Sequence, residues 1–403
     1  MNDEFTKRYN SLNKEQKQAV DIIDGPLMVV AGPGTGKTEL LSLRAANILR
    51  TTDASPQNIL CLTFTESGAT AMRQRLAGLI GSDAYKIAIH TFHSFGAETI
   101  NQQGEYFYNG AHFRPADELH AYEILRSIFQ KLPHDNPLSV MMNDDYTYLR
   151  DTQSTISDLK KSGLLHDELL KILDMNDAFL SWVQPKVDEA FTGRLSKKSF
   201  PAIRDLIEQI SAYIEEPCDL LIYRPLYLQV AESLGSALNA SESENSTKPL
   251  SAWKRVWSEK KPDGSLTLKD EKRARKLRAV AHVYNDYLIG MQRAELFDFD
   301  DMILRVVHAL ELFDDLRFNL QEKYQYIMID EFQDTNDAQM RLAWNLSNNP
   351  SSEGRPNLMV VGDDDQAIYR FQGANVANIH GFKSRFRDVE TITLQNNYRS
   401  TQV

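Results

Sequence analysis

The sequence predicts an α/β protein in which a parallel sheet flanked by helices is interrupted by a mostly helical insertion. Short apolar segments typical of buried parallel strands recur along the chain, and the segments between them carry apolar residues at helical spacing. From about residue 104 to residue 296, strand-like segments become scarce and helical patterns dominate. Alternating strands and helices are typical of a doubly wound α/β domain.

Five segments are short, apolar, often β-branched and bounded by turn or helix signals. The predicted strands are therefore residues 27–31, 59–65, 87–90, 326–329 and 358–362. Helices are predicted between them, for example at residues 39–50 and 69–80. The predicted organisation is one α/β domain made of residues 1–104 and 297–390, a helical insertion at 105–296, and the start of a second domain at 391–403.

The composition is that of an ordinary globular protein. The chain has 403 residues, 42% of them hydrophobic and 25% charged, with a formal net charge of −11. The conspicuous apolar run at 27–31 is far shorter than the ~18 residues of a membrane helix, and the first ten residues lack the apolar stretch of a signal peptide. Two cysteines fit a reducing compartment. We therefore expect a cytoplasmic protein that does not bind membranes.

Two segments of the insertion have a biased composition. Residues 239–249 are polar and of low complexity, which predicts a mobile loop. Residues 253–278 contain ten Lys or Arg residues against four acidic ones, a local charge of +6. A solvated helix face and a nucleic-acid-binding surface are both open interpretations of this basic stretch.

A phosphate-binding loop is predicted where strand 27–31 leads into a helix. Its sequence is Ala31-Gly32-Pro33-Gly34-Thr35-Gly36-Lys37-Thr38. The glycines let successive N–H groups face a polyanion, and the helix N-terminus adds partial positive charge. Lys37 is expected to reach the β- and γ-phosphates of a nucleoside triphosphate, and Thr38 to supply a hydroxyl to Mg²⁺. The alternative is a glycine-rich turn with a surface lysine.

Acidic residues follow two further predicted strands. Strand 326–329 leads directly into Asp330 and Glu331, and strand 358–362 is followed by three Asp residues and Gln366. Parallel strands bring these positions to the sheet edge that carries the phosphate loop. Asp330 is expected to hold Mg²⁺, Glu331 to activate the attacking water, and Gln366 to contact the γ-phosphate or that water. Solvated turns are the alternative for both clusters.

In their order along the chain, these segments resemble the motifs of the UvrD/Rep/PcrA-like superfamily 1 DNA helicases. Besides the phosphate loop, the resemblance rests on LNKEQ at 12–16, TFT at 63–65, TFHSF at 91–95, DFDD at 298–301, DEFQDT at 330–335, residues 362–374, and QNNYRST at 395–401. The insertion is covered by position rather than by motif. The resemblance implies a RecA-like P-loop ATPase domain and, from residue 391, the start of a second RecA-like domain.

What the resemblance implies for function is an enzyme that hydrolyses ATP with Mg²⁺, moves 3′ to 5′ on single-stranded DNA and separates duplexes at single-strand/duplex junctions. It implies that Gln16 reads the adenine and that Gln366 couples the γ-phosphate to the DNA site. Tyr398 would stack on the base, and Arg399 would reach the γ-phosphate.

The DNA contacts that the resemblance implies are Thr63, Phe64, Thr65, Thr91, His93, Tyr369 and Phe371. Aromatic faces stack on any base, so such contacts permit movement without sequence preference. Core packing is the preferred interpretation for Phe92, and a buried, hydrogen-bonded histidine is an alternative for His93.

Three residues depart from the family pattern. Glu39 stands where the family usually has an arginine that packs on the adenine, which predicts a weaker or less selective base clamp. Phe371 replaces the usual tryptophan and Gln372 the usual arginine, changes that reduce stacking area and remove a cation.

The sequence ends at Val403, just after the motif that carries Tyr398 and Arg399. We expect a fragment with one wall of the ATP site, which binds nucleotide with little turnover. The alternative function is a nucleotide-dependent DNA-binding module without unwinding activity.

Overall fold

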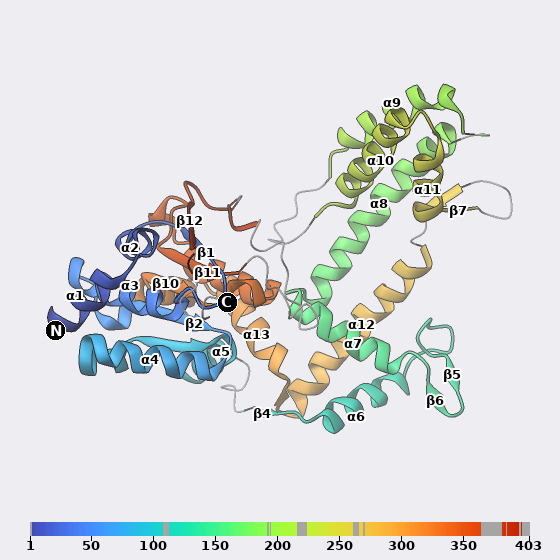
Figure 1. Cartoon of the computed structure of the whole chain (residues 1–403). Coiled ribbons are helices and arrows are strands. Elements are labelled where there is room, and N and C mark those ends of the chain that lie inside the picture. The colour runs from blue at the N-terminus through green and yellow to red at the C-terminus, as the bar shows by residue number, and fades with distance from the viewer. Residues whose placement is uncertain are drawn as a thin grey trace, which may run out of the picture. The chain divides into compact units, whose positions relative to one another are not determined.

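The computed structural model describes residues 2–107, 113–191, 193, 195–215, 224–260, 266–268, 271–363, 381–383, 385–394 and 396. The chain divides into two compact units (Figure 1). The α/β unit comprises Met1–Glu118, Ser157–Gly163 and Gln292–Val403, and the helical unit comprises Leu119–Ile156 and Leu164–Met291. Within the described part of the chain, no helix combines the length and apolar character needed to cross a membrane.

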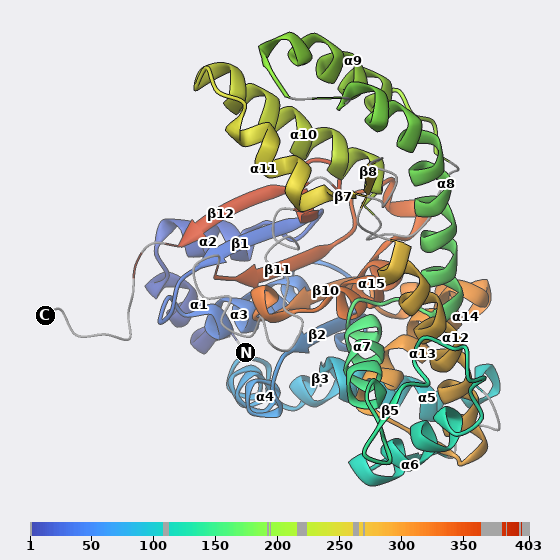
Figure 2. The same cartoon turned by 90° about the vertical axis from the view of Figure 1, so that its right-hand side faces the viewer.

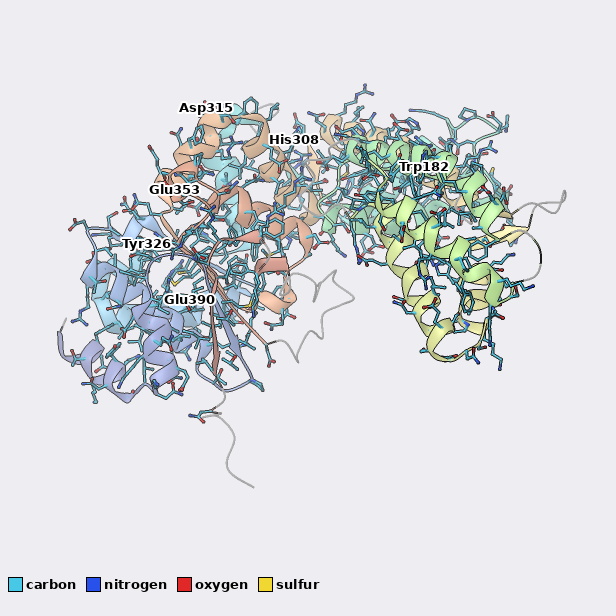
Figure 3. All side chains as sticks on the ribbon, turned by 90° about the horizontal axis from the view of Figure 1, so that it is seen from above. Trp182, His308, Asp315, Tyr326, Glu353 and Glu390 are labelled. Atoms are coloured by element: carbon cyan, nitrogen blue, oxygen red, sulfur yellow. The ribbon has the colours of Figure 1, made fainter. Side chains whose placement is uncertain are left out.

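The α/β unit contains one six-stranded parallel sheet, which confirms the predicted fold class. Its strands lie in the order β12 (Glu390–Leu394), β1 (Leu27–Ala31), β11 (Leu358–Gly362), β10 (Tyr326–Ile329), β2 (Ile59–Thr63) and β3 (Ala88–Thr91). Figure 2 shows these strands side by side, and Tyr326 and Glu390 in Figure 3 mark the first residues of β10 and β12. The five predicted strands form within two residues of their expected bounds.

Strand β12 was not predicted from the sequence. It pairs with β1 at the edge of the described sheet, and only Ile392 and Leu394 of its five residues are buried. An edge strand needs only alternate apolar residues, so β12 lacks the continuous apolar run that reveals the inner strands. It begins at residue 390, where the sequence places the boundary of the first domain.

Two groups of helices accompany the sheet. The first group consists of α1 (Asn2–Ser11), α2 (Lys14–Asp21), α3 (Lys37–Thr51) and α4 (Glu66–Ile80). Its buried residues share a core with alternate strand residues, among them Val29, Cys61 and Val361. The second group consists of α5 (Phe92–Gln102), α13 (Phe299–Leu312), α14 (Asp314–Lys323) and α15 (Asp337–Ser347), which pack against one another.

The helical unit is built from long helices and short antiparallel pairs. Its helices are α6 (Glu118–Phe129), α7 (Leu149–Lys161), α8 (His166–Ala190), α9 (Phe200–Ser211), α10 (Leu226–Ser243), α11 (Lys248–Trp257) and α12 (Glu271–Arg293). The last turns of α7, from Ser157, and the end of α12, from Gln292, belong to the α/β unit. Helices α8 to α11 surround a core that includes Phe179 and Trp253, and Trp182 of α8 is labelled in Figure 3. The short strand pairs are β5 (Met141–Met142) with β6 (Asp145–Tyr146) and β7 (Ser258–Lys260) with β8 (Leu266–Leu268). In the α/β unit, β4 (Arg114–Pro115) pairs with β9 (Leu296–Phe297).

The predicted mobile loop at residues 239–249 is wrong, because most of this segment is helical. It contains the end of α10 and the start of α11. Ser241 is buried, its hydroxyl accepts a hydrogen bond from the Leu250 N–H at 3.2 Å, and its carbonyl accepts one from the Ser246 N–H at 2.9 Å. Ser241 therefore ties two packed helices together instead of facing solvent.

The basic stretch at 253–278 makes many contacts inside the helical unit. The Arg278 guanidinium lies 2.6 Å from both Asp174 and Asp177, and Lys276 lies over the Tyr148 ring. Trp253 is buried and stacks on Trp257. For these residues, ion pairing and aromatic packing within the unit favour the helix-face interpretation.

Candidate functional site

The glycine-rich loop connects the end of β1 to the start of α3. Gly34 and Gly36 have φ angles of 75° and 85°, in the left-handed region that glycine adopts without steric cost. The Thr35 hydroxyl donates to the Gly32 carbonyl at 2.8 Å, which closes the loop on itself. Lys37 and Thr38 are the first two residues of α3. The loop therefore presents backbone N–H groups, a helix N-terminus and a lysine at one sheet edge.

Lys37 is paired with Glu331, which lies 294 positions further along the chain. The Lys37 ammonium donates to Glu331 Oε2. Glu331 lies between β10 and the 3₁₀ turn Phe332–Asp334 and has a left-handed backbone (φ 51°, ψ 47°), which is costly for a residue with a Cβ. The sheet thus brings the phosphate loop and the predicted water-activating carboxylate together.

Asp330 is held at the same edge. Its N–H donates to the Leu62 carbonyl of the neighbouring strand β2 at 2.9 Å, and its carboxylate accepts from the Glu331 N–H at 3.0 Å. Burial, followed by the charge of Glu331, raises the pKa of Asp330 to about 6, while Lys37 acts in the opposite direction. Asp330 is therefore a buried acid whose ionised form would be favoured by an added cation.

Gln16 lies against the phosphate loop. Its side-chain N–H₂ donates to the Thr35 carbonyl at 2.9 Å, and its Oε1 accepts from the Asn13 N–H at 3.1 Å. Gln16 is 5% exposed and completes the capping box at the start of α2. These contacts fix the loop, whereas reading of the adenine stays a prediction.

Glu39, the departure in the family pattern, is surrounded by arginines. Arg8 of α1 lies 3.4 Å from one carboxylate oxygen, and Arg75 of α4 lies 3.7 Å from the other. Where the family usually has an arginine, this chain thus has a glutamate with two arginines beside it.

Gln333 connects the ends of β10 and β11. It lies in the short 3₁₀ turn Phe332–Asp334, where its side-chain N–H₂ donates to Glu331 at 2.9 Å and to Asp334 at 3.2 Å. Its Oε1 accepts from the Asp363 N–H at 2.9 Å. Sequence reasoning assigned no role to Gln333, and its position inside the DEFQDT motif was the only signal.

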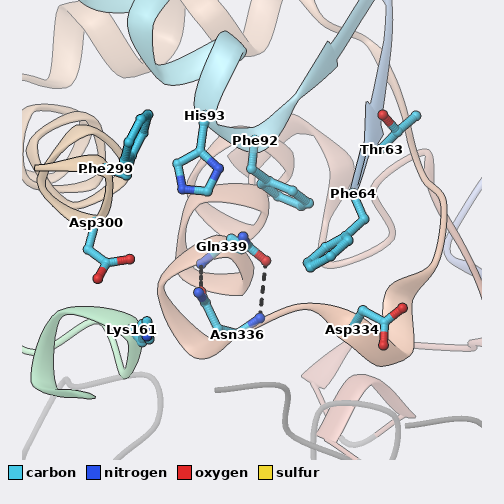
Figure 4. A pocket seen from close by; sticks show the side chains of 10 residues that line it. All are labelled: Thr63, Phe64, Phe92, His93, Lys161, Phe299, Asp300, Asp334, Asn336 and Gln339. Atoms are coloured by element: carbon cyan, nitrogen blue, oxygen red, sulfur yellow. Dashed lines mark hydrogen bonds between the residues drawn. The ribbon is translucent and has the colours of Figure 1, made fainter. Parts of the chain in front are cut away.

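A pocket of about 430 Å³ lies next to this turn in the α/β unit (Figure 4). In Figure 4, four rings lie along one side of the pocket, and Asp334, Asn336 and Lys161 lie on the other. The lining residues are Thr63, Phe64, Phe92, His93, Lys161, Phe299, Asp300, Asp334, Asn336 and Gln339. An aromatic wall facing polar groups suits a flat, polar ligand, and Lys161 supplies one cation beside the carboxylates of Asp300 and Asp334.

The pocket includes some predicted DNA contacts and not others. Thr63, Phe64 and His93 line it, and Phe92 is both a lining residue and 2% exposed, in keeping with the core packing expected for it. Thr65 and Thr91 instead cap helices: their hydroxyls accept from the N–H groups of Gly68 and Ser94 at 3.0 and 3.1 Å.

The pocket contains two titratable groups with shifted pKa values, the half-buried His93 and the buried Asp334. Burial lowers the pKa of His93, although the charge of Asp300 opposes this, and its ring lies edge-on to Phe299 with centroids 6.1 Å apart. Burial, then the charge of Glu331, raises the pKa of Asp334 to about 6. Asp334 Oδ1 is buried and has no hydrogen-bond partner among the described residues.

Lys161 is brought to the pocket by a buried ion cluster that the sequence did not reveal. The neighbouring Lys160 is 1% exposed and lies 2.5 Å from Asp298 and 2.6 Å from Asp301. Both acids belong to the capping box at the start of α13. Arg341 adds a second anchor, because its guanidinium donates to the Gly163 carbonyl at 2.5 Å. Residues 157–163 are thereby fixed to the α/β unit.

Several predicted site residues lie outside the described residues, namely Gln366, Tyr369, Phe371, Gln372, Tyr398 and Arg399. Among the residues with a described position, no group of three or more His, Cys, Asp or Glu side chains is arranged to hold a metal ion. Mg²⁺ commonly takes one or two protein ligands together with water and phosphate oxygens, so Thr38 and Asp330 fit such a role.

The fold and the loop define the class of protein. A parallel sheet with a glycine-rich phosphate loop after β1 and an acidic pair after β10 is a RecA-like P-loop domain. The family model of the UvrD/REP helicase N-terminal domain matches residues 12–387, and the chain belongs to this family. The resemblance identified from the motifs is thus confirmed.

The curated relatives that the chain resembles are named as DNA helicases. The chain is 29% identical over 392 residues to the ATP-dependent DNA helicase PcrA of Staphylococcus epidermidis, covering 97% of this chain and 38% of that protein. It is 26% identical over 394 residues to the ATP-dependent DNA helicase PcrA of Leuconostoc citreum, covering 98% and 38%. The PcrA of Staphylococcus aureus is 28% identical over 393 residues. The chain spans 38% of the length of these relatives.

Proposed function

We propose that this chain is the ATP-binding and DNA-binding part of a DNA helicase that uses Mg²⁺ and ATP to move 3′ to 5′ on single-stranded DNA and to separate duplexes at junctions. The observation that carries the proposal is the contact between Lys37 of the phosphate loop and Glu331 at the end of β10. Polarity and unwinding rest on the resemblance to the family and on the names of the relatives.

On the nucleotide side, the loop N–H groups and the start of α3 bind the phosphates, and Lys37 neutralises their charge. Thr38 and Asp330 would hold Mg²⁺, which when bound neutralises charge on the phosphate oxygens. Glu331 orients and deprotonates the attacking water. The Lys37 ammonium cannot pair fully with the phosphates and with Glu331 at the same time. Nucleotide binding therefore breaks its ion pair with Glu331 and leaves that carboxylate able to accept a proton from water.

On the DNA side, the aromatic wall of the pocket stacks on bases and Lys161 attracts the phosphate backbone. Thr63, Phe64 and His93 make these contacts, and Thr65 and Thr91 cap the starts of α4 and α5 beside them. Stacking on any base explains how a motor advances without reading sequence.

The remaining roles complete the same proposal. Gln16 contacts the adenine, and Gln366 couples the two sites. The far wall of the nucleotide site is formed by Tyr398 and Arg399, and the DNA path continues over Tyr369 and Phe371. Residues 1–104 and 297–390 form the first motor domain together with the remainder of β12, residues 105–296 form its insertion, and the part of 391–403 that follows β12 begins the second motor domain.

The test compares the wild-type chain with Lys37→Ala. A fluorescent ATP analogue with Mg²⁺ and a labelled oligo(dT) should each bind the wild type. Lys37→Ala should weaken nucleotide binding at least tenfold and change oligo(dT) affinity less than threefold. Lys171→Ala, at an exposed position of α8, is the matched control and should change neither. Absence of both nucleotide and DNA binding in the folded wild type would overturn the proposal.

A further inference from the structure

Gln333 lies between two carboxylates that face different sites. One is Glu331, the partner of Lys37 in the nucleotide site, and the other is Asp334, which lines the aromatic pocket. The same amide group donates to both. A single side chain therefore links the two sites through direct hydrogen bonds.

An amide is well suited to this position. Two like-charged acceptors can share one side chain only if it offers two N–H donors, which the Gln333 amide has. Its remaining oxygen accepts from the Asp363 N–H at the end of β11. Gln333 is 3% exposed, so these hydrogen bonds are shielded from competing water.

The amide is also held tightly by packing. A Cβ placed on Gly362 would lie 2.8 Å from Gln333 Oε1 and 3.1 Å from its backbone nitrogen. Glycine is needed at the end of β11 because of this close approach. Rotation of the amide away from either carboxylate would also break its hydrogen bond with the Asp363 N–H at the end of β11, so the positions of the three partners are linked.

Ligand binding in either site should change the contacts of the carboxylate that Gln333 holds there. Glu331 Oε2 accepts from Lys37 as well as from Gln333, and phosphates that attract Lys37 leave Gln333 holding that oxygen. Asp334 Oδ2 accepts from Gln333, and Asp334 also lines the aromatic pocket, so a ligand in the pocket changes the surroundings of this carboxylate.

We propose that Gln333 is a positioning residue that couples occupancy of the nucleotide site to occupancy of the aromatic pocket. It does so by bridging Glu331 and Asp334, separately from the role assigned to Gln366. The inference rests on the proposed function, because it takes the first site to bind nucleotide and the second to bind single-stranded DNA. Linkage requires the effect to be reciprocal: each ligand changes the affinity of the other by one common factor.

The experiment measures that factor in the full 403-residue chain. The affinity of labelled oligo(dT) is determined with and without a saturating non-hydrolysable ATP analogue and Mg²⁺, and the affinity of the analogue with and without oligo(dT). The wild type should show the same factor both ways, at about 5-fold or more. Gln333→Met, which keeps the length but removes the donors, should bring the factor below 2 and leave each separate affinity within threefold.

Gln321→Met is the matched control. Gln321 is equally buried at 3% exposure, and its side-chain N–H₂ donates to the carbonyls of Asn345 and Asn348, away from both sites. It should lose similar stability and keep the wild-type factor. Two further variants cover a failure of Gln333→Met to fold: Gln333→Glu, which replaces the donor by a carboxylate, and Asp334→Asn, which removes one partner's charge. Both should lower the factor.

The outcomes separate this inference from the proposed function. A wild type that binds neither ligand contradicts the proposed function. A wild type that binds both ligands with a factor near 1 overturns the coupling and leaves the proposed function standing. The coupling is equally overturned if the Gln333 variants keep the wild-type factor, or if Gln321→Met loses it to the same extent.

Discussion

At the scale of single residues, the nucleotide site depends on a glutamate in an unfavourable backbone conformation. Glu331 has a left-handed φ of 51°, and its side chain is held by Lys37 and Gln333. Such a conformation costs roughly 1–3 kcal/mol and persists where surrounding contacts determine it. This backbone conformation directs the Glu331 carboxylate toward Lys37 of the phosphate loop.

Replacement of Glu331 by glutamine should separate binding from hydrolysis. Glu331→Gln removes the charge that holds Lys37, so nucleotide should bind as tightly as before or tighter. Loss of the general base should lower ATP turnover by ~10²–10⁴-fold. Equilibrium binding of a fluorescent ATP analogue and a phosphate-release assay measure the two effects.

Glu353→Gln is the control for this substitution. Glu353, labelled in Figure 3, is an exposed glutamate that also has a left-handed φ, of 50°, in a turn remote from these contacts. It should leave both quantities unchanged. Equal losses of turnover in the two variants would show that the effect is not specific to the carboxylate at 331.

His93 should make the free energy of unfolding of the protein depend on pH. Burial lowers its pKa below the usual value of about 6.5, so the unfolded chain takes up a proton before the folded one as the pH falls. The free energy of unfolding should therefore rise with pH up to about 6.5 and lose this contribution to the slope above it. Urea unfolding from pH 5 to 8 should show a shallower rise for His93→Gln, and an identical rise would contradict a lowered pKa of His93 in the folded protein.

At the scale of secondary-structure elements, the end of β11 is adapted to the turn after β10. Gly362→Ala would place a Cβ 2.8 Å from Gln333 Oε1, and the turn must move to admit it. We expect a loss of ~1–3 kcal/mol in stability, as for other insertions into packed interiors, together with weaker ATP turnover. Thermal or urea unfolding and a phosphate-release assay measure these effects.

Gly235→Ala in α10 is the control for Gly362→Ala. An added Cβ at Gly235 meets nothing within 4 Å, and alanine favours a helix over glycine by ~1 kcal/mol. This variant should be neutral or more stable. Equal stability of both variants would show that the end of β11 accommodates a Cβ without displacing the turn.

The elements differ in how far the sequence reveals them. The inner strands β1, β10 and β11 have the predicted bounds, since burial on both faces demands an unbroken apolar run. The edge strand β12 needs only alternate apolar residues and was missed. The serines near residue 241 predicted a loop, because sequence alone does not show that their hydrogen bonds lie inside a helix pair.

The same distinction applies to the site. Lys37 and Glu331 could be predicted because each stands at the end of a recognisable strand or at the start of a helix. Gln333 and Lys160 could not, because their partners are set by tertiary packing. Lys160 contacts Asp298, 138 positions away, and nothing local in the sequence distinguishes it from its neighbour Lys161.

At the scale of the whole molecule, the α/β unit is assembled from three separate parts of the chain. The short middle part, Ser157–Gly163, is anchored by the contacts of Lys160 with Asp298 and Asp301 and by that of Arg341 with Gly163. A seven-residue segment has no core of its own, so these buried polar contacts determine where it lies.

Loss of the Lys160 charge should therefore destabilise the α/β unit strongly. Lys160→Met leaves two buried carboxylates without their cation, for which a loss of about 3–5 kcal/mol is typical. Burial, and then the charge of Asp301, already raises the pKa of Asp298, and removal of Lys160 raises it further. Since protonation relieves the repulsion, the loss should be smaller at pH 5 than at pH 8.

Urea unfolding at the two pH values measures this loss. Lys161→Met, one position along and facing the pocket, should change stability by less than ~1 kcal/mol. Adding Asp298→Asn and Asp301→Asn to Lys160→Met should recover part of the loss. An equal loss at both pH values would contradict an electrostatic origin.

The strand order also has a consequence for biosynthesis. Strands β1 and β2 leave the ribosome early, but β11 and β10 separate them in the finished sheet. From Thr63 to Tyr326 the chain grows by 263 residues (326 − 63), which takes roughly 13–50 s at ~5–20 residues per second. The helical unit ends at Met291, so all of it is translated before β10 and β11. The nascent protein must therefore keep β1 and β2 apart, with their inner edges unsatisfied, until the strands that join them are made.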